Sequence, residues 1–382
     1  MRTIAVITGT RAEYGILKPV LKKIEASPAL TLRLIVTGMH LCPDYGYTVD
    51  QIVADGFPIA ARVEMILSSD TTAAMGKSLG IGITGLCHEI EHLKPDVVLV
   101  LGDRIEAFAG ATAGLFCGTA IAHLHGGDIT QGGLDEYMRH AITKLSHIHF
   151  PATPKSQERI LHLGENPDFV YTVGTPGLDA ILAFPDLSNA EISARLGIRL
   201  PDRFVLLCQH PISTLPETAA RELRETLLAL QEARLPTILL YPNADAGSRQ
   251  MLHEIRQMAK QDWLISFPSL PRDLYCNLLK RALMLVGNSS SGMIDAPAYG
   301  VPVINIGDRQ AGRERGENVL DSPPERHAIA HAIHRALTDT DFIEKAQNTG
   351  NPYGDGKASE RICRTLENVD LHKAKGQKQF VC

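Results

Sequence analysis

The stretch IAVITGTRAEYGILKPVLKKIEASPALTLRLIVT, residues 4–37, decides the fold class. It begins with an apolar run, Ile4 to Thr8, and continues through a glycine turn into an amphipathic segment, Gly15 to Ala26. A second apolar run, Leu32 to Thr37, follows. An amphipathic segment of helical period between two short apolar runs is typical of a βαβ unit with parallel strands. The first forty residues therefore predict an α/β protein.

The same alternation returns further along the chain. The expected elements there are a helix, Ala107 to Cys117, and three strands: Asp96 to Leu101, Ile121 to Leu124 and Ile148 to Pro151. Because these strands are apolar throughout, helices must cover both faces of their sheet. The pattern predicts an open, doubly wound parallel sheet.

A second domain follows the first. Glycines and prolines interrupt the periodicity in residues 173–203, and strand–helix alternation then restarts with strands 204–209, 237–241, 264–267 and 283–286 and helices 217–233 and 247–260. We place the domain boundary near residue 172, so that the domains span 1–172 and 173–354. The remaining residues, 355–382, begin with a helix over Ala358 to Leu366 and are expected to end in a loose tail.

Composition and charge exclude several classes of protein. The chain has 382 residues, of which 44% are apolar, and Lys plus Arg total 38 against 43 for Asp plus Glu, giving a formal net charge of -5. No basic field is available for nucleic acid. The longest nearly uncharged stretch, Phe108 to Leu124, is shorter than the ~20 residues of a membrane helix. We expect a cytoplasmic protein with neither a nucleic-acid nor a membrane partner.

Metal sites are not expected, although two histidine motifs suggest them. His88 to His92 fits the HExxH pattern of zinc proteases, but the segment leads directly into a buried strand and is better explained as the solvent face of a crossover helix. His327, His331 and His334 lie at helical spacing without a carboxylate or cysteine at ligand spacing. The seven cysteines form no CxxC pair, which disfavours a zinc ribbon or a disulfide framework.

A glycine- and serine-rich turn is a candidate phosphate site. Gly287 to Gly292, GNSSSG, lies between an apolar strand and a helical stretch that begins at Met293. Such a loop offers backbone N–H groups, hydroxyls and the positive end of a helix dipole to a phosphate or diphosphate. A plain turn capped by serine is the alternative.

Three arginines follow strands in the same way. Arg11 lies in Gly9-Thr10-Arg11, Arg104 lies in Gly102-Asp103-Arg104, and Arg309 follows the strand Val301 to Ile306. Open α/β sheets bind their ligands at the carboxyl ends of their strands. One arginine in such a place is commonly a surface ion pair, but three equivalent ones predict a shared anion.

Candidate acids and bases gather at strand ends as well. The HLHGGD segment holds His123 and His125, and His210 ends a strand of the second domain. Further candidates follow the HLHGGD segment closely: Asp135, Glu136, Arg139 and His140. Groups at strand ends are well placed for proton transfer, whereas buried histidines commonly only satisfy hydrogen bonds. Both roles remain open from these residues alone.

Eight strings, taken together, carry a family resemblance. In order they are GTRAEYG (9–15), GDR (102–104), HLHGGD (123–128), RHAITK (139–144), QHP (209–211), PNADAGS (242–248), GNSSSG (287–292) and VPVINIGDRQAGRERGENV (301–319). The sequence resembles the hydrolysing UDP-N-acetylglucosamine 2-epimerases of sialic and legionaminic acid biosynthesis. The resemblance implies the glycosyltransferase B type of fold, in which two Rossmann-like domains face a cleft and a C-terminal helix returns to the first domain.

The resemblance also implies a reaction. Proton abstraction at C2 of the sugar and anti elimination of UDP leave 2-acetamidoglucal, and water then adds to give N-acetylmannosamine. No metal or nicotinamide cofactor is required. The expected partner is a UDP-sugar substrate, and the expected assembly is a homodimer or homotetramer.

Site residues are carried over by position in the motifs. The implied nucleotide-binding residues are Arg11, Arg104, Ser289, Ser290 and Arg309, with Asp295 as the ribose-binding acid. The implied catalytic residues are Asp103, His125, Asp135 and His210, and the implied sugar-binding residues are His40 and Asn243. Some relatives carry Glu where this chain has His125 and Asp295.

Four alternatives remain. UDP-N,N'-diacetylbacillosamine could replace UDP-N-acetylglucosamine as the substrate of the same reaction. In the non-hydrolysing 2-epimerases we expect Pro in place of Ala12, and Glu-Ala-Gly in place of Leu124-His125-Gly126. A glycosyltransferase of the same fold would pass the sugar to an acceptor. A catalytically idle sugar-nucleotide-binding protein would have no reason to keep the acid and base groups Asp103, Asp135 and His210.

Overall fold

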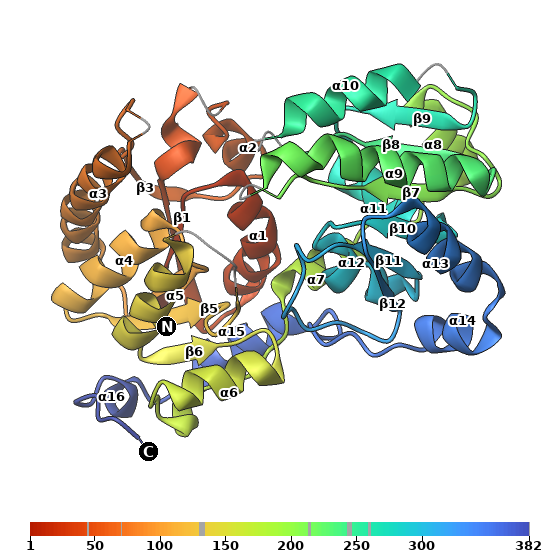
Figure 1. Cartoon of the computed structure of the whole chain (residues 1–382). Helices are drawn as coiled ribbons and strands as arrows, with labels where there is room; N and C mark the ends of the chain where they lie inside the picture. Colours follow the sequence, from red (N-terminus) through yellow and green to blue (C-terminus); the bar gives the residue numbers. More distant parts are fainter. Residues whose placement is uncertain are drawn as a thin grey trace. The chain divides into compact units, whose positions relative to one another are not determined.

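The chain forms two compact units, each built on one sheet. The computed structural model describes residues 1–43, 46–69, 71–129, 134–212, 215–242, 247–258 and 261–381. Unit 1 consists of Met1–Ala180 and Tyr353–Cys382, and unit 2 of Ile181–Pro352. Each unit holds a six-stranded sheet with helices packed on it (Figure 1). The expected fold class, two doubly wound α/β sheets, is confirmed.

The sheet of unit 1 is parallel throughout and runs in the order β3-β2-β1-β4-β5-β6. Its strands are β1 (Arg2–Thr8), β2 (Leu30–Thr37), β3 (Ile59–Val63), β4 (Val97–Leu101), β5 (Ala120–Leu124) and β6 (Ile148–Phe150). The chain moves outward from β1 to β3 and then returns to place β4 on the other side of β1. This reversal between β1 and β4 is the switch point at which Rossmann-type sheets bind ligands.

Helices cover both faces of this sheet. They are α1 (Arg11–Ala26), α2 (Val49–Ala54), α3 (Thr72–Leu93), α4 (Ile105–Phe116), α5 (Asp135–Leu145), α6 (Pro154–His162), α7 (Pro176–Leu182), α15 (Ala358–Asn368) and α16 (Leu371–Ala374), with short 3-10 turns η1 (Gly38–Leu41) and η3 (Pro167–Phe169). Ile4 and Val6 of β1 belong to the core beside α1 and α15. Ala5 and Ile7, which alternate with them, belong to the core beside α3 and α4. The alternation explains why β1 is apolar at every position.

Unit 2 repeats the arrangement, with all pairs parallel and the order β12-β11-β10-β7-β8-β9. The strands are β7 (Val205–Cys208), β8 (Thr237–Leu240), β9 (Leu264–Phe267), β10 (Met284–Gly287), β11 (Val303–Ile306) and β12 (Val319–Ser322). The helices are α8 (Asn189–Leu196), α9 (Ala219–Glu232), α10 (Ser248–Met258), α11 (Arg272–Arg281), α12 (Ser291–Ile294), α13 (Arg326–Thr338) and α14 (Thr340–Gln347), with 3-10 turns η4 (Pro216–Thr218) and η5 (Ala296–Tyr299). The switch point lies between β7 and β10.

The C-terminal segment is part of unit 1. Ile362 and Leu366 of α15 are fully buried in the core that α1 also lines. The carboxylate of Asp179 caps α15 by accepting the backbone N–H groups of Ala358 at 3.0 Å and Ser359 at 2.7 Å. The last residues, which the sequence predicts to be loose, lie against the loop at Gly164, whose carbonyl accepts the N–H of Val381 at 3.2 Å.

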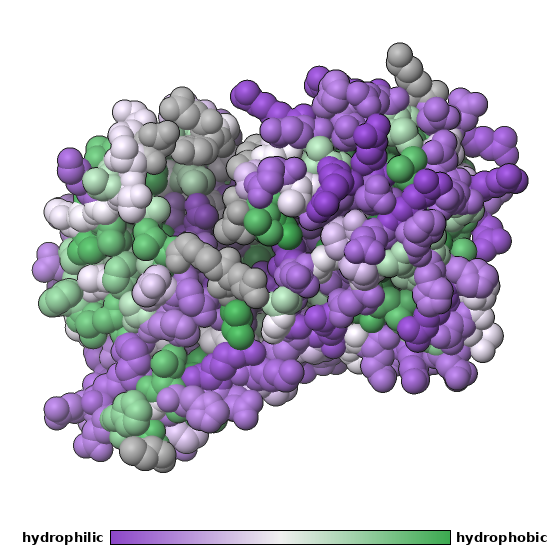
Figure 2. Space-filling view, in the orientation of Figure 1, coloured by the Kyte–Doolittle hydropathy of each residue, from purple (hydrophilic) through white to green (hydrophobic). Residues whose placement is uncertain are grey.

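Apolar side chains are exposed on two neighbouring helices of unit 1. The exposed apolar side chains of α3 and α4 include Ile81, Leu115 and Phe116, and Phe116 is 81% exposed. Figure 2 shows hydrophobic residues gathered over these two helices. Among the described residues, no helix is long and apolar enough to cross a membrane.

Candidate functional site

Two exposed arginines mark the switch point of unit 1. Thr10 caps α1, because its hydroxyl accepts the N–H of Glu13 at 3.3 Å, and Arg11 is then the first residue of the helix. Arg104 occupies the same relation to β4, as the residue that precedes α4. Both arginines are exposed, and neither forms an ion pair with the described part of the chain. The loops after β1 and β4 therefore present two cations on the two sides of the switch point.

Asp103 and Asp135 form a carboxylate pair beside these cations. The guanidinium of Arg139, only 2% exposed, forms an ion pair with Asp103 and donates a hydrogen bond to the carbonyl oxygen of Asp128 at 2.7 Å. The pKa of Asp135 is raised, first by partial burial and then by the nearby Asp103 carboxylate. Two carboxylates of which one holds its proton more tightly are suited to general acid–base chemistry.

His125 is held by two hydrogen bonds in a backbone conformation that L-residues rarely adopt. Its φ is +62°, in the left-handed region. The ring Nδ1 lies 3.0 Å from Asp128 Oδ2, and Nε2 lies 3.1 Å from Thr175 Oγ1. Burial raises the pKa of Asp128, but hydrogen bonds from His125 and Ser156 outweigh it, so that this pKa is lowered. An oriented imidazole with a carboxylate on one nitrogen is a common arrangement for proton transfer.

Two other histidines of unit 1 lie inside the fold. His123 is fully buried, its Nε2 lies 2.7 Å from the carbonyl oxygen of Gly102, and burial lowers its pKa to about 3. His40 is also fully buried, with Nε2 3.1 Å from Thr8 Oγ1 and Nδ1 2.7 Å from Thr48 Oγ1. Both ring nitrogens of His40 are thus hydrogen-bonded, and its backbone N–H donates to the Gly9 carbonyl oxygen at 3.2 Å, so that His40 lies beside the loop that carries Arg11. Asn243, the other expected sugar contact, lies outside the described residues.

In unit 2 the loops after β7 and β10 are tied together. Asn288 accepts the N–H of His210 through Oδ1 at 2.7 Å and donates from Nδ2 to the His210 carbonyl oxygen at 2.9 Å. The preceding Gly287 has φ +126°, and a Cβ there would lie 2.2 Å from the Cys208 carbonyl oxygen. Only glycine fits at this point, which explains the first letter of the GNSSSG motif.

Arg309 joins the same loop cluster. Its Nη1 donates to the Asn288 carbonyl oxygen at 3.0 Å, and Gln310 Nε2 donates to that oxygen at 2.9 Å. Ser289 and Ser290 are half-buried at the start of α12. The structure therefore brings His210, Ser289, Ser290 and Arg309 together at the switch point of unit 2.

Asp295 is occupied by partners of its own. Its carboxylate is 5% exposed, and Oδ2 accepts hydrogen bonds from Arg272 Nη2 at 2.6 Å and from Ser291 Oγ at 2.7 Å. Arg272, which the sequence analysis does not single out, is half-exposed at the start of α11 and stacks over the Tyr275 ring at 5.4 Å. Its position in the loop after β9 is the signal that identifies it, because it matches that of the other strand-end arginines.

The two histidine motifs lie on solvent faces, as expected. His88 and His92 are exposed on α3, and His327, His331 and His334 are exposed on α13. Within the described ranges, no group of three or more His, Cys, Asp or Glu side chains is placed to hold a metal ion.

Comparison with known proteins gives consistent matches over nearly the whole chain. The model of the UDP-N-acetylglucosamine 2-epimerase family matches residues 22–367. The chain is 36% identical over 372 residues to a UDP-N,N'-diacetylbacillosamine 2-epimerase (hydrolyzing) of Legionella pneumophila, with 97% of each chain covered. It is 34% identical over 385 residues to a UDP-N-acetylglucosamine 2-epimerase of Neisseria meningitidis, covering 100% of this chain and 99% of the other.

A solved structure shares the fold at lower identity. The Neisseria meningitidis UDP-GlcNAc 2-epimerase bound to UDP-GlcNAc superposes with a TM-score of 0.77 at 19% identity, covering 96% of this chain and 99% of that one. This likeness supports the two-unit α/β architecture independently of the sequence motifs.

Proposed function

The chain belongs to the UDP-N-acetylglucosamine 2-epimerase family, and we propose that it is a hydrolysing member that converts UDP-N-acetylglucosamine and water into N-acetylmannosamine and UDP. One observation carries the proposal. In each unit the polar loops flank the point where the strand order reverses, after β1 and β4 in unit 1 and after β7 and β10 in unit 2. Ligands of open α/β sheets bind at such points.

Unit 2 is proposed to hold the nucleotide. Arg309, Ser289 and Ser290 supply a cation, hydroxyls and backbone N–H groups to the diphosphate. Asp295 is buried and already bonded to Arg272 and Ser291, so we assign it to orienting Arg272 rather than to direct contact with the ribose. Arg11 and Arg104 of unit 1 are proposed to neutralise the diphosphate of UDP as it leaves the sugar.

Unit 1 is proposed to carry the sugar chemistry. A base removes the proton at C2, the C2–H electron pair forms the C1=C2 double bond, and the C1–O bond breaks so that UDP leaves with its electron pair. Water then adds at C1 and a proton is delivered to C2, giving the manno sugar. Asp103, fixed by its ion pair with Arg139, is proposed as the base, and Asp135, whose pKa is raised, as a group that exchanges the proton.

His125 and His210 complete the proposed set of catalytic residues. The His125 ring is oriented by Asp128 and Thr175. His210 is oriented by Asn288 through its backbone. Imidazole exchanges protons near neutral pH, so both are proposed to serve in elimination or hydration.

UDP-N,N'-diacetylbacillosamine is the second candidate substrate. The similarity to the Legionella pneumophila protein of that name favours it. One difference between the two substrates lies at C4, where an acetamido group replaces a hydroxyl. Incubation of the purified protein with each UDP-sugar, followed by identification of the free sugar, tests both candidates. An epimerised sugar still bound to UDP would instead indicate a non-hydrolysing enzyme, and transfer to an acceptor a glycosyltransferase.

A homo-oligomer is proposed as the working assembly. The exposed Ile81, Leu115 and Phe116 of α3 and α4 form an apolar area that a second copy would bury. Light scattering on the purified protein measures the mass directly. A monomer at micromolar concentration would contradict the proposal.

A further inference from the structure

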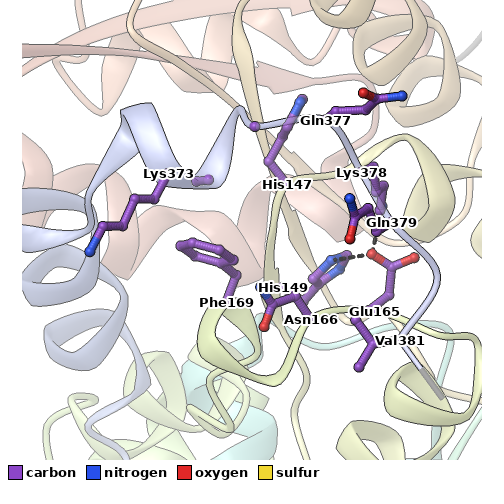
Figure 3. A pocket seen from close by; sticks show the side chains of 12 residues that line it. His147, His149, Glu165, Asn166, Phe169, Lys373, Gln377, Lys378, Gln379 and Val381 are labelled. Atoms are coloured by element: carbon purple, nitrogen blue, oxygen red, sulfur yellow. Dashed lines mark hydrogen bonds and ion pairs between the residues drawn. The ribbon is translucent and has the colours of Figure 1, made fainter.

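The C-terminal tail is fixed to unit 1 by an ion pair with a buried carboxylate, that of Glu165. The tail covers a cavity of about 170 Å³, whose walls include His149, Glu165 and Lys378 (Figure 3). Lys378 Nζ lies 2.6 Å from Glu165 Oε2, and Lys144 Nζ lies 2.6 Å from Glu165 Oε1. These contacts join the tail to the end of α5 and to the loop after α6.

Glu165 depends on these cations because it is buried. Its side chain is 1% exposed, and it also accepts a hydrogen bond from His149 Nε2 at 3.1 Å. Burial raises the pKa of Glu165, but hydrogen bonds from His149, Lys144 and Lys378 outweigh it and bring the pKa to about 2. A buried carboxylate that loses one of its cations keeps the cost of its desolvation without compensation. Lys378 is therefore firmly bound where it lies.

The same lysine caps helix α5. Lys378 Nζ lies within hydrogen-bond distance of three carbonyl oxygens, those of Thr143 at 3.2 Å, Lys144 at 2.7 Å and Ser146 at 2.6 Å. Ser146 is the C-terminal cap of α5, and its N–H already donates to the Thr143 carbonyl oxygen at 3.2 Å. The lysine therefore adds a second donor there and also reaches the carbonyl oxygens of Lys144 and Ser146 at the end of the helix, where intrahelical donors run out. A cation at the negative end of the helix dipole stabilises the last turn.

Helix α5 leads from this cap to the candidate catalytic groups. Asp135 is its first residue, and Arg139, which pairs with Asp103, lies one turn later. Thr143 Oγ1 donates to the Arg139 carbonyl oxygen at 3.0 Å.

A second set of contacts between the end of α5 and Asp103 passes through His123. Thr143 Oγ1 lies 3.4 Å from His123 Nδ1, and His123 Nε2 lies 2.7 Å from the carbonyl oxygen of Gly102. Gly102 directly precedes Asp103. Two sets of contacts thus join the tail to Asp103, one along α5 and one across β5.

We propose that Lys378 is a positioning residue for catalysis: by capping α5 it holds Asp135 and Arg139 in register with Asp103. The proposal rests on the proposed function, since it assigns the tail a part in that reaction. Misplacing catalytic groups should lower turnover while leaving UDP binding intact, because the proposed diphosphate groups Ser289, Ser290 and Arg309 belong to unit 2, whereas the tail belongs to unit 1.

The experiment compares three variants of the full chain. Lys378→Met keeps the aliphatic stem and removes the cation, Lys378→Arg keeps a cationic donor, and Lys373→Met is the matched control on the same tail. We expect Lys378→Met to lower kcat at least about fivefold with KM and UDP affinity unchanged. Lys378→Arg should recover most of kcat, and Lys373→Met should equal the wild type. A folded Lys378→Met with wild-type kcat, or an Arg variant no better than the Met variant, would overturn the proposal.

Amide hydrogen exchange tests the tail separately from the proposed function. If the wild type releases no sugar from either UDP-sugar, the proposed function fails, but the exchange of residues 140–147 still reports on the cap. Faster exchange there in Lys378→Met than in Lys373→Met supports the structural half of the inference, and equal exchange contradicts it. Should Lys378→Met fail to fold, Lys378→Gln retains a donor and is measured by the same two readouts, with the same expected direction.

Discussion

Asn288 hydrogen-bonds both backbone polar groups of His210, accepting its N–H at 2.7 Å and donating to its carbonyl oxygen at 2.9 Å. The two residues follow β10 and β7, the neighbouring strands at the switch point of unit 2. One amide side chain therefore fixes the backbone of His210, a candidate acid–base residue, beside the serine loop that is proposed to bind diphosphate. The bond explains why an asparagine interrupts an otherwise small-residue loop.

Asn288→Ala tests this relationship. The N–H and carbonyl of His210 would lose their partners, so we expect a loss of about 1–3 kcal/mol in the free energy of unfolding. We also expect kcat to fall by about tenfold, because His210 would no longer be held in place. Denaturant unfolding and steady-state kinetics measure the two effects. Asn348→Ala is the control, since the side-chain amide of Asn348 donates to the Glu344 carbonyl oxygen at the end of α14, away from the loops after β7 and β10. Wild-type values for Asn288→Ala would contradict the assignment.

Arg309→Ala tests the nucleotide site. Loss of a charge-assisted contact to diphosphate should weaken UDP binding by about 2 kcal/mol or more, which is about thirtyfold in Kd. Isothermal titration calorimetry measures it. Arg335→Ala on α13, where the arginine pairs with Asp339 on the surface, is the matched control and should bind UDP normally. Unchanged UDP affinity in a folded Arg309→Ala protein would remove Arg309 from the site.

Glu106 gives a prediction about stability and pH. It is 1% exposed, and neither carboxyl oxygen has a hydrogen-bond partner in the part of the chain that the structure describes. It lies against Gly9 and Gly38, where a Cβ would come within 2.4 Å of its side chain. Burial raises the pKa of Glu106, and burial together with Glu106 raises that of the neighbouring Glu13.

The direction in which stability changes with pH follows from the linkage between proton binding and folding. A carboxyl whose pKa is higher in the folded state binds its proton more tightly there, so its contribution to stability is complete below the unfolded pKa of about 4.3 and is lost as pH rises through the folded value. Glu106→Gln does not titrate and relieves Glu13 of a like charge. We therefore expect the stability of Glu106→Gln to fall less than that of the wild type as pH rises from about 4.3. Thermal melts across pH measure this difference. Parallel curves for the two proteins would contradict the buried-acid assignment.

Chelation separates the proposed chemistry from the zinc-protease interpretation of His88 to His92. Those histidines are exposed on α3, and the proposed elimination uses only side chains and water. Activity should therefore survive treatment with EDTA. Loss of activity that returns on addition of zinc would contradict the proposed mechanism.

The sequence predicts the loops of the site better than it predicts the state of single side chains. Arg11, Arg104 and His210 follow strands, as the sequence predicts, because apolar parallel strands can be recognised from their composition and their carboxyl ends form the ligand-binding edge of a sheet. Burial is harder to predict. His40 follows β2 at a strand end like the others, yet it packs inward between Thr8 and Thr48. Nothing in its local motif distinguishes an inward-facing imidazole from an outward-facing one.

The features that the sequence does not predict depend on contacts between residues that are far apart in the chain. Arg272 and Asp295 are 23 residues apart and meet only when α11 and α12 pack at one edge of the sheet. Lys378 lies in a polar stretch whose composition predicts a loose tail, and its acceptors on α5 are 232 to 235 residues away. Composition indicates how well a segment is solvated, but a buried carboxylate such as Glu165 becomes visible only in the folded chain.

Turnover in D2O is the measurement that tests the central claim most directly. If C2 is deprotonated before UDP leaves, the released N-acetylmannosamine, or its diacetylated analogue, should carry one solvent deuterium at C2, as mass spectrometry and NMR would show. Asp103→Asn should abolish both UDP release and deuterium incorporation in a folded protein, and His210→Asn should slow both, since an amide exchanges no proton near neutral pH. A released sugar of manno configuration without deuterium at C2 would contradict the elimination mechanism, and a gluco product would show simple hydrolysis of the glycosidic bond.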